Sequence, residues 1–218
     1  MKIDCISDLH GEFPKLDGGD LLIIAGDLTA NDLPHQRFEF LKWLSEQDYR
    51  KKIWIAGNHD NSLIGLNFTP LRPNSAEYLC DSVTEFEGLK IWGSPWTKTF
   101  PGINPHCKAF TKDTDEELDE KWKKIPDDID ILITHSPPYG IFDTIYSRLL
   151  RKNPIPFEAG SVSLRNHVMD RIKPNLHVFG HIHEWGGRML DTCTTKFVNA
   201  SLMNNDYEPT NEPVTVIL

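Results

Sequence analysis

The sequence predicts an α/β fold, formed by one domain that spans residues 1–218. Three observations predict it. Short apolar runs of strand length alternate with segments of helical periodicity. Five of these runs are followed directly by Asp, Asn or His, which is typical of the ligand-binding edge of an α/β sheet. The composition, 39% hydrophobic and 25% charged over 218 residues, is that of a soluble globular chain long enough to bury a core.

Five apolar runs are predicted to be strands. Each is short and apolar on both faces, as expected of a strand that is buried on both sides of a sheet. They cover residues 3–6, 21–25, 53–56, 131–134 and 176–179. Because helical segments separate several of them, we expect a largely parallel sheet.

Three segments are predicted to be helices, at residues 34–48, 115–124 and 161–172. In the first, Phe38, Leu41 and Leu44 recur at three-residue steps and form an apolar face. The third ends before Pro174, which cannot continue a helix.

A second group of apolar runs is expected to form another, more antiparallel sheet packed on the first. Residues 82–86 and 89–93 flank Glu87 and Gly88, a pair typical of a hairpin turn. Residues 196–200 and 213–217 come late in the chain and have no helix between them. The chain shows no linker or internal repeat that would divide it, so one layered domain is predicted.

The charge and the cysteines bear on partners and compartment. Lys and Arg number 23 and Asp and Glu number 32, so the net charge of −9 disfavours long nucleic acid as a partner. Apolar runs are too short to span a membrane, and residues 1–10 are too polar for a signal peptide. The four cysteines are dispersed, which suits a reducing compartment. We therefore expect a cytoplasmic protein with no membrane partner.

The polar residues that follow the five predicted strands are the candidate site. Because the carboxyl ends of neighbouring parallel strands meet at one edge, these side chains are expected to share a cleft. In three cases a glycine precedes the polar group and lets the backbone approach closely. The candidate residues are Asp8, His10, Asp27, Asn58, His59, Asp60, His135, His181 and His183.

Seven of these side chains are predicted to hold two divalent metal ions. Residues i and i+2 leaving a strand point the same way, so Asp8 with His10 and His181 with His183 are each expected to bring two ligand groups into one cleft. Mixed carboxylate, amide and imidazole donors suit Mn, Fe, Co or Zn. A set without thiolates disfavours a structural zinc site, and seven donors exceed the need of one tetrahedral ion. The predicted ligands are Asp8, His10, Asp27, Asn58, His135, His181 and His183.

Taken singly, each of these short motifs has an ordinary structural explanation, such as a hydrogen-bonded histidine. As an ordered set they resemble the five-block signature of the calcineurin-like metallophosphoesterases, and the set spans residues 8 to 183. The segments 92–96, 134–138 and 199–201 further resemble the small metallophosphoesterase-domain branch, which is similar to class III phosphodiesterases. The resemblance implies a four-layer α/β/β/α sandwich of two mixed sheets flanked by helices.

The resemblance also implies residue roles. One ion would be held by Asp8, His10, Asp27 and His183, and the other by Asp27, Asn58, His135 and His181. Asp27 would thus be shared by both ions. His59 would contact the phosphoryl group and protonate the leaving alkoxide. Asp60 would orient the His59 imidazole, and a helix cap is the alternative for this carboxylate.

One departure from relatives concerns the substrate. After Gly26 and Asp27 the chain reads Leu-Thr-Ala-Asn-Asp, without the Asp-Arg-Gly that marks protein Ser/Thr phosphatases. This difference argues against phosphoprotein substrates. The loops at 99–106 and 137–157 are expected to shape the substrate pocket, with Arg148, Arg151 and Lys152 as candidate phosphate contacts.

The predicted function is hydrolysis of small phosphodiesters by a dinuclear metal centre that forms hydroxide from a water between its ions. Cyclic nucleotides enter as an example through the resemblance only, and phosphomonoesters are a further substrate class. Manganese is the first choice of metal in vitro. Two alternatives remain. A nuclease of the same fold would need a basic track, against which the net charge argues. A metal-binding scaffold without catalysis would not need His59 or a complete ligand set.

Overall fold

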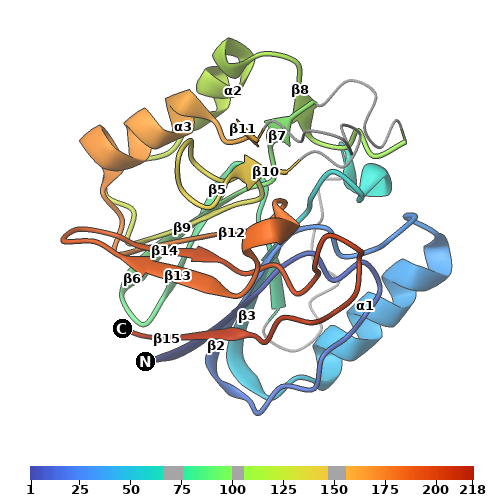
Figure 1. Ribbon diagram of the computed structural model, residues 1–218. Coiled ribbons are helices and arrows are strands. Elements are labelled where there is room, and N and C mark those ends of the chain that lie inside the picture. Colours follow the sequence, from blue (N-terminus) through green and yellow to red (C-terminus); the bar gives the residue numbers. More distant parts are fainter. Residues whose placement is uncertain (66–75, 100–105, 147–155) are drawn as a thin grey trace.

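The computed structural model describes residues 1–65, 76–99, 106–146 and 156–218. Two β-sheets pack face to face, and helices cover their outer faces (Figure 1). Three apolar cores separate these layers. One lies between the sheets and includes Ile23 and Ile133, one lies between the first sheet and its helix, and one lies under the helices of the second sheet. The predicted α/β/β/α sandwich of two mixed sheets is therefore confirmed.

The first sheet has the order β15-β1-β2-β3-β4. Its strands are β1 (Lys2–Ile6), β2 (Gly19–Ala25), β3 (Tyr49–Ile55), β4 (Ala76–Tyr78) and β15 (Val214–Ile217). Strands β1 to β4 run parallel, and β15 is antiparallel to β1. Helix α1 (Pro34–Glu46) packs Phe40 and Leu44 against the outer face of this sheet.

The second sheet has the order β13-β14-β12-β9-β6-β5. Its strands are β5 (Ser82–Phe86), β6 (Leu89–Ser94), β9 (Ile131–Thr134), β12 (Leu176–Phe179), β13 (Arg188–Asp191) and β14 (Lys196–Asn199). The four central strands are parallel, and the two edge strands are antiparallel to their neighbours. The β5–β6 pair is the predicted hairpin.

Helices α2 (Asp115–Trp122) and α3 (Val162–Asn166) cover the second sheet (Figure 1). Thr114 caps α2 by accepting the backbone N–H of Glu117, whose side chain accepts the Thr114 N–H in return. The third predicted helix is present, but its second half is the π-helical turn η3 (His167–Ile172). The smaller elements are η1 (Asn61–Leu63), η4 (His183–Trp185), β7 (Thr97–Lys98), β8 (Thr111–Lys112), β10 (Thr144–Ile145) and β11 (Phe157–Glu158). Among the described helices, none has the length and apolar character of a membrane span.

The predicted assignment of strands to the two sheets is wrong in three places. Strands β9 and β12 lie in the second sheet rather than the first, and β15 lies in the first rather than the second. In a sandwich, central strands of either sheet are buried on both faces, so their apolar pattern is the same. Membership in a sheet depends on pairing between segments far apart in the chain, which local periodicity does not report.

Candidate metal centre

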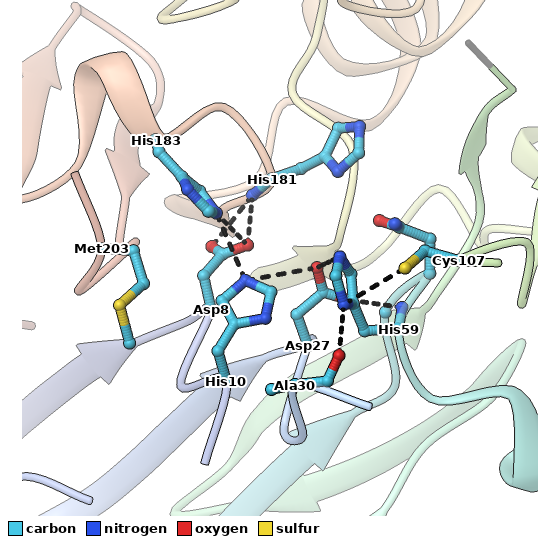
Figure 2. Close-up of polar contacts among 12 residues, drawn as sticks. Asp8, His10, Asp27, Ala30, His59, Cys107, His181, His183 and Met203 are labelled. Carbon is cyan, nitrogen blue, oxygen red and sulfur yellow. Dashed lines mark hydrogen bonds and ion pairs between the residues drawn. The ribbon is translucent and has the colours of Figure 1, made fainter. Parts of the chain in front are cut away.

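The predicted site residues converge where strands of both sheets end. Strands β1, β2 and β3 of the first sheet and β9 and β12 of the second direct their carboxyl ends to this edge. Figure 2 shows the side chains of Asp8, His10, Asp27, His59 and His183 gathered around one centre. The edge on which the five strands meet is therefore built jointly by the two sheets, not by one.

The first group of donors consists of Asp8, His10 and His183. Nε2 of His183 lies 3.4 Å from Oδ1 of Asp8 and 3.4 Å from Nε2 of His10. All three side chains offer ligand atoms within 4.8 Å of one another. Asp27 adjoins this group, because its Oδ2 lies 3.8 Å from Nε2 of His10.

The second group consists of Asp27, Asn58, His135 and His181. Nε2 of His135 lies 3.4 Å from Oδ2 of Asp27 and 3.0 Å from Oδ1 of Asn58. Ligand atoms of Asp27, His135 and His181 also lie within 4.8 Å of one another. The Asp27 carboxylate thus belongs to the second group and adjoins the first through His10.

The backbone leaves the strands in an unusual conformation at these positions. Asp8, His10, Asp27 and His181 have φ values of 52°, 45°, 51° and 69°, in the left-handed region. Such residues cost about 1–3 kcal/mol each and persist where the surrounding structure holds them. Backbone hydrogen bonds hold two of them, from Asp8 N to Gly26 O and from His10 N to Asp27 O. Strands β1 and β12 end where predicted, at Ile6 and Phe179, but the left-handed residues after them do not continue the extended i, i+2 alternation.

Two of the glycines in the motifs are required by close approach. A Cβ atom at Gly57 would lie 2.2 Å from Oδ1 of Asp27, and one at Gly180 would lie 2.2 Å from Oδ2 of Asp8. Contacts this short are sterically excluded. The backbone at each position therefore packs directly against a carboxylate of the neighbouring strand end, as the sequence predicts.

The electrostatics favour bound cations. Burial alone would raise the pKa of Asp8, but the hydrogen bond and charge of His183 hold it well below its usual value. Burial lowers the pKa of His10 to about 4 and that of His181 to about 3, so both imidazoles are neutral at pH 7. Nε2 of His10 faces Nε2 of His183, and Nδ1 of His10 has no hydrogen-bond partner among the described residues. Neutral imidazoles and buried carboxylates are the donor set that divalent transition metals prefer, so the residues fit two such ions.

His59 lies beside the ligands with its ring fixed. Its Nδ1–H donates to the carbonyl oxygen of Ala30 at 2.9 Å, and Sγ of Cys107 lies 3.4 Å from the same nitrogen. Nε2 faces the centre, 3.9 Å from Oδ2 of Asp27. The Ala30 contact leaves Nε2 as the atom that can exchange a proton with a ligand.

The sequence predicts that Asp60 orients the His59 imidazole or caps a helix, but its carboxylate does neither. Its buried carboxylate accepts hydrogen bonds from the backbone N–H groups of Gly57, Leu28 and Thr29 and from the Thr29 hydroxyl. The imidazole of His59 has Ala30 as its partner instead, and the Asp60 side chain makes no helix-cap hydrogen bond. Burial, followed by the charge of Asp27, raises the pKa of Asp60 to about 7. Asp60 therefore ties the loop after β2 to the loop after β3.

Residues near the centre that the sequence did not single out come from loops. Ala30 and Cys107 contact His59, and Tyr207 lies over the histidines, with its ring centroid 5.0 Å from that of His10 and 4.8 Å from that of His183. No motif marks them, because their roles depend on contacts distant in sequence. His106, in the loop at 99–106 that is expected to shape the substrate pocket, lines a cleft beside His59. The predicted phosphate contacts Arg148, Arg151 and Lys152 lie outside the described residues.

Comparison with known proteins agrees with this geometry. The family model for the calcineurin-like phosphoesterases matches residues 1–185. The human metallophosphoesterase domain-containing protein 1 is 38% identical over 240 residues, covering 98% of this chain and 70% of the human protein. A UPF0046 protein of Caenorhabditis elegans is 33% identical over 234 residues, covering 98% of this chain and 79% of that protein. One solved structure, 13% identical, shares the fold with a TM-score of 0.60 and covers 99% of this chain and 98% of its own. The chain belongs to the calcineurin-like phosphoesterase family of metal-dependent hydrolases.

Proposed function

We propose that the protein hydrolyses small phosphodiesters, and phosphomonoesters more slowly, with two divalent metal ions of which manganese is the first candidate. The observation that carries this proposal is the place of the Asp27 carboxylate between the two groups. Its Oδ2 lies 3.8 Å from Nε2 of His10, 3.4 Å from Nε2 of His135 and 3.9 Å from Nε2 of His59. When bound, two divalent ions supply the charge that polarises a phosphate ester and acidifies an attacking water molecule.

In this proposal His59 is the general acid. Its ring is held by the Nδ1–H donated to Ala30, so protonated Nε2 is directed to the position of a leaving oxygen. Transfer of that proton neutralises the developing alkoxide as the ester bond breaks, and such acid catalysis contributes about 10²–10⁴ in rate. The neighbouring Asp60 supports this arrangement only indirectly, by holding together the loops that carry Asp27 and His59.

Two clefts beside the centre support a preference for diesters. A cleft of about 350 Å³ is lined by His59, His10 and Tyr207, and another of about 430 Å³ by His183, Arg188 and Asn204. Residues 204–206 line the second cleft and Tyr207 lines the first, so one loop separates them. A diester carries two ester groups and can occupy both clefts, whereas a monoester occupies one. Cyclic nucleotides are small diesters that belong in the substrate panel.

The charge and the clefts also favour a small substrate over a nucleic acid. The chain has a net charge of −9, and Glu184 and Asp206 line the larger cleft. A long polyanion would be repelled by this surface, because binding to nucleic acid depends on positive charge along the strand. The proposal includes a cytoplasmic location, which the free thiols of the four cysteines support.

The test compares wild type with His59→Ala, using metal-stripped protein reloaded with Mn²⁺. We expect metal-dependent turnover of an alkyl aryl phosphodiester. Where the leaving alcohol is weakly acidic, His59→Ala should lower kcat by about 10²–10⁴ with the metal content unchanged. A nitrophenyl leaving group should show a smaller loss, since it departs without a proton. His35→Ala, which changes an exposed histidine on α1, is the control.

Two results would contradict the proposal. A wild-type protein that binds two ions and hydrolyses no phosphate ester would favour the scaffold alternative. Rapid cleavage of duplex DNA at physiological salt would favour the nuclease. Both assays use the same metal-loaded preparation.

A further inference from the structure

Tyr207 lies in the loop that joins β14 to β15, beyond the residues 1–185 that match the family model. This loop, drawn in red in Figure 1, runs beside the end of β1. The backbone N–H of Leu202 donates to Ser7 O at 3.0 Å, and Ser201 pairs with Ser7 as an isolated bridge. The loop is therefore anchored one residue before the ligand Asp8.

Side-chain amides hold the loop in shape. Oδ1 of Asn204 accepts the backbone N–H groups of Asp206 and Glu208 at 2.8 and 3.1 Å. Nδ2 of Asn211 donates to the carbonyls of Ser201 and Met203 at 3.2 and 3.0 Å. Tyr207 itself has a φ of 60°, a conformation that a bulky residue adopts only when its surroundings impose it. The ring is thus presented by a preformed turn.

The Tyr207 ring stands over the candidate centre. Its centroid lies 4.8 Å from that of His183, 5.0 Å from that of His10 and 6.4 Å from that of His59. The residue is nevertheless 46% exposed, so part of its surface is open to a ligand. It lines the cleft that contains His59, together with Ala30, Asn31, His106 and Cys107.

We propose that Tyr207 determines specificity for the departing alcohol, favouring flat aromatic groups over aliphatic ones. This inference rests on the proposed function, because it takes His59 as the acid that protonates the leaving oxygen. The group attached to that oxygen must then occupy the cleft beside His59, where the Tyr207 ring forms one wall. An aromatic ring packed on another in a stacked or edge-on arrangement gains up to about 1.5 kcal/mol, close to tenfold in affinity.

The second cleft is lined by different side chains, which predicts which of the two ester groups each cleft accepts. It is lined mostly by charged and amide side chains, among them Glu184, Arg188 and Asn204, with Tyr146 as an aromatic exception. The His59 cleft has no carboxylate among its described lining residues and is formed mostly by the rings of Tyr207 and the histidines, with Cys107, Ala30 and one amide, Asn31. The ester group that remains on phosphorus therefore meets mostly charged and amide walls, and the group that departs meets mostly rings.

The kinetic test uses methyl phenyl phosphate and methyl hexafluoroisopropyl phosphate, whose departing alcohols have similar acidity but different shapes. Tyr207→Leu should lower kcat/KM for the phenyl ester by about fivefold to tenfold and change the aliphatic ester less than about twofold. Tyr207→Phe should behave as wild type. Phe38→Leu, at an exposed aromatic residue on α1, is the control and should change neither ester.

A binding test does not depend on turnover. Phenylphosphonate and methylphosphonate have a carbon–phosphorus bond that hydrolysis does not break, and calorimetry on Mn²⁺-loaded protein gives both affinities. Wild type should bind phenylphosphonate about tenfold more tightly, and Tyr207→Leu should abolish that difference. If wild type hydrolyses neither ester, the proposed function fails, and the phosphonate pair still decides the role of Tyr207.

Three results would overturn the inference. Equal loss for both esters in Tyr207→Leu would mean that the ring does not discriminate between departing groups. Loss of bound manganese in Tyr207→Leu would assign the ring to support of His10 and His183. A defect of Tyr207→Phe as large as that of Tyr207→Leu would assign the effect to the hydroxyl group.

Discussion

One buried polar cluster surrounds Asp4 in the middle of β1, another lies beyond the carboxyl end of this strand, and the two are built differently. Asp4, inside the strand, is 4% exposed and has a donor for each oxygen. The Tyr49 hydroxyl donates to Oδ2 at 2.5 Å, the Thr215 hydroxyl donates to Oδ1 at 2.6 Å, and Nζ of Lys2 lies 3.2 Å from Oδ2. Burial and the adjacent Asp4 raise the pKa of Tyr49, so the phenol remains a donor. This cluster is satisfied by its own side chains.

The cluster after the end of β1 is not satisfied in this way. Two imidazole nitrogens, Nε2 of His10 and Nε2 of His183, face each other at 3.4 Å. Oδ2 of Asp27 lies within 4 Å of three imidazoles, and four of the predicted ligands have left-handed backbone conformations. The comparison teaches that a structural polar cluster pairs donors with acceptors, whereas a binding cluster converges its acceptors on a point and needs a cation to complete it.

The largest effect is expected from Asp27→Ala, because this carboxylate lies between the two groups of donors, near His10 of the first and His135 of the second. We expect metal affinity to fall by more than about 100-fold, exceeding the loss typical of residues that only support a ligand. Metal content by mass spectrometry of the purified protein measures it. Asp17→Ala, at an exposed aspartate, is the control. Retention of two ions by Asp27→Ala would show that the cluster is structural, like that of Asp4.

Gly180→Ala should have the next largest effect. The added Cβ would lie 2.2 Å from Oδ2 of Asp8, so the carboxylate must move and metal affinity should fall by about 10–100-fold. Titration with Mn²⁺ measures the loss. Gly88→Ala is the control, since no atom lies within 4 Å of the added Cβ there, although the backbone of Gly88 is left-handed and that of Gly180 is not. If both variants bind metal equally well, the close approach at Gly180 does not matter.

Asp60→Asn tests a carboxylate that lies beside the candidate metal centre but, like that of Asp4, accepts hydrogen bonds from donors of the protein. The carboxylate accepts from Gly57, Leu28 and Thr29, and an amide would turn a donor toward some of these N–H groups. We expect a loss of about 1–3 kcal/mol in the free energy of unfolding, measured with urea. Unchanged stability with a lower kcat would instead support the predicted orientation of His59 by Asp60.

Tyr49→Phe should have the smallest effect, and it tests the structural cluster around Asp4. It removes the hydrogen bond to Asp4 and should cost about 1 kcal/mol of unfolding free energy, with turnover and metal content unchanged. Urea unfolding measures the free energy of unfolding, and the Mn²⁺ titration measures metal binding. A change in metal affinity would mean that the Asp4 cluster and the candidate metal centre are coupled.

Much of the fold followed from local patterns. Strands β9 and β12 have the predicted bounds, and α1 begins at the predicted Pro34 and ends two residues before the predicted boundary. The candidate site followed from the polar residues after each strand, and the structure brings all nine together. The contacts of Asp60 and the left-handed turns at Asp8 and His181 could not be predicted from local patterns. Both depend on which backbone groups of other segments lie next to these residues in the fold.

The sequence by itself determined most strands of both sheets, the main helices, the family and the set of polar residues at the strand ends, because each is encoded in neighbouring residues. Strands β4 and β13 are not among the predicted strands. The tertiary structure decided which sheet β9, β12 and β15 join, that Oδ2 of Asp27 lies within 4 Å of His10 and His135, and that Tyr207 stands over His10 and His183. These features depend on pairing and packing between segments that are distant in the chain. Such contacts are chosen by the whole fold, and no local pattern encodes them.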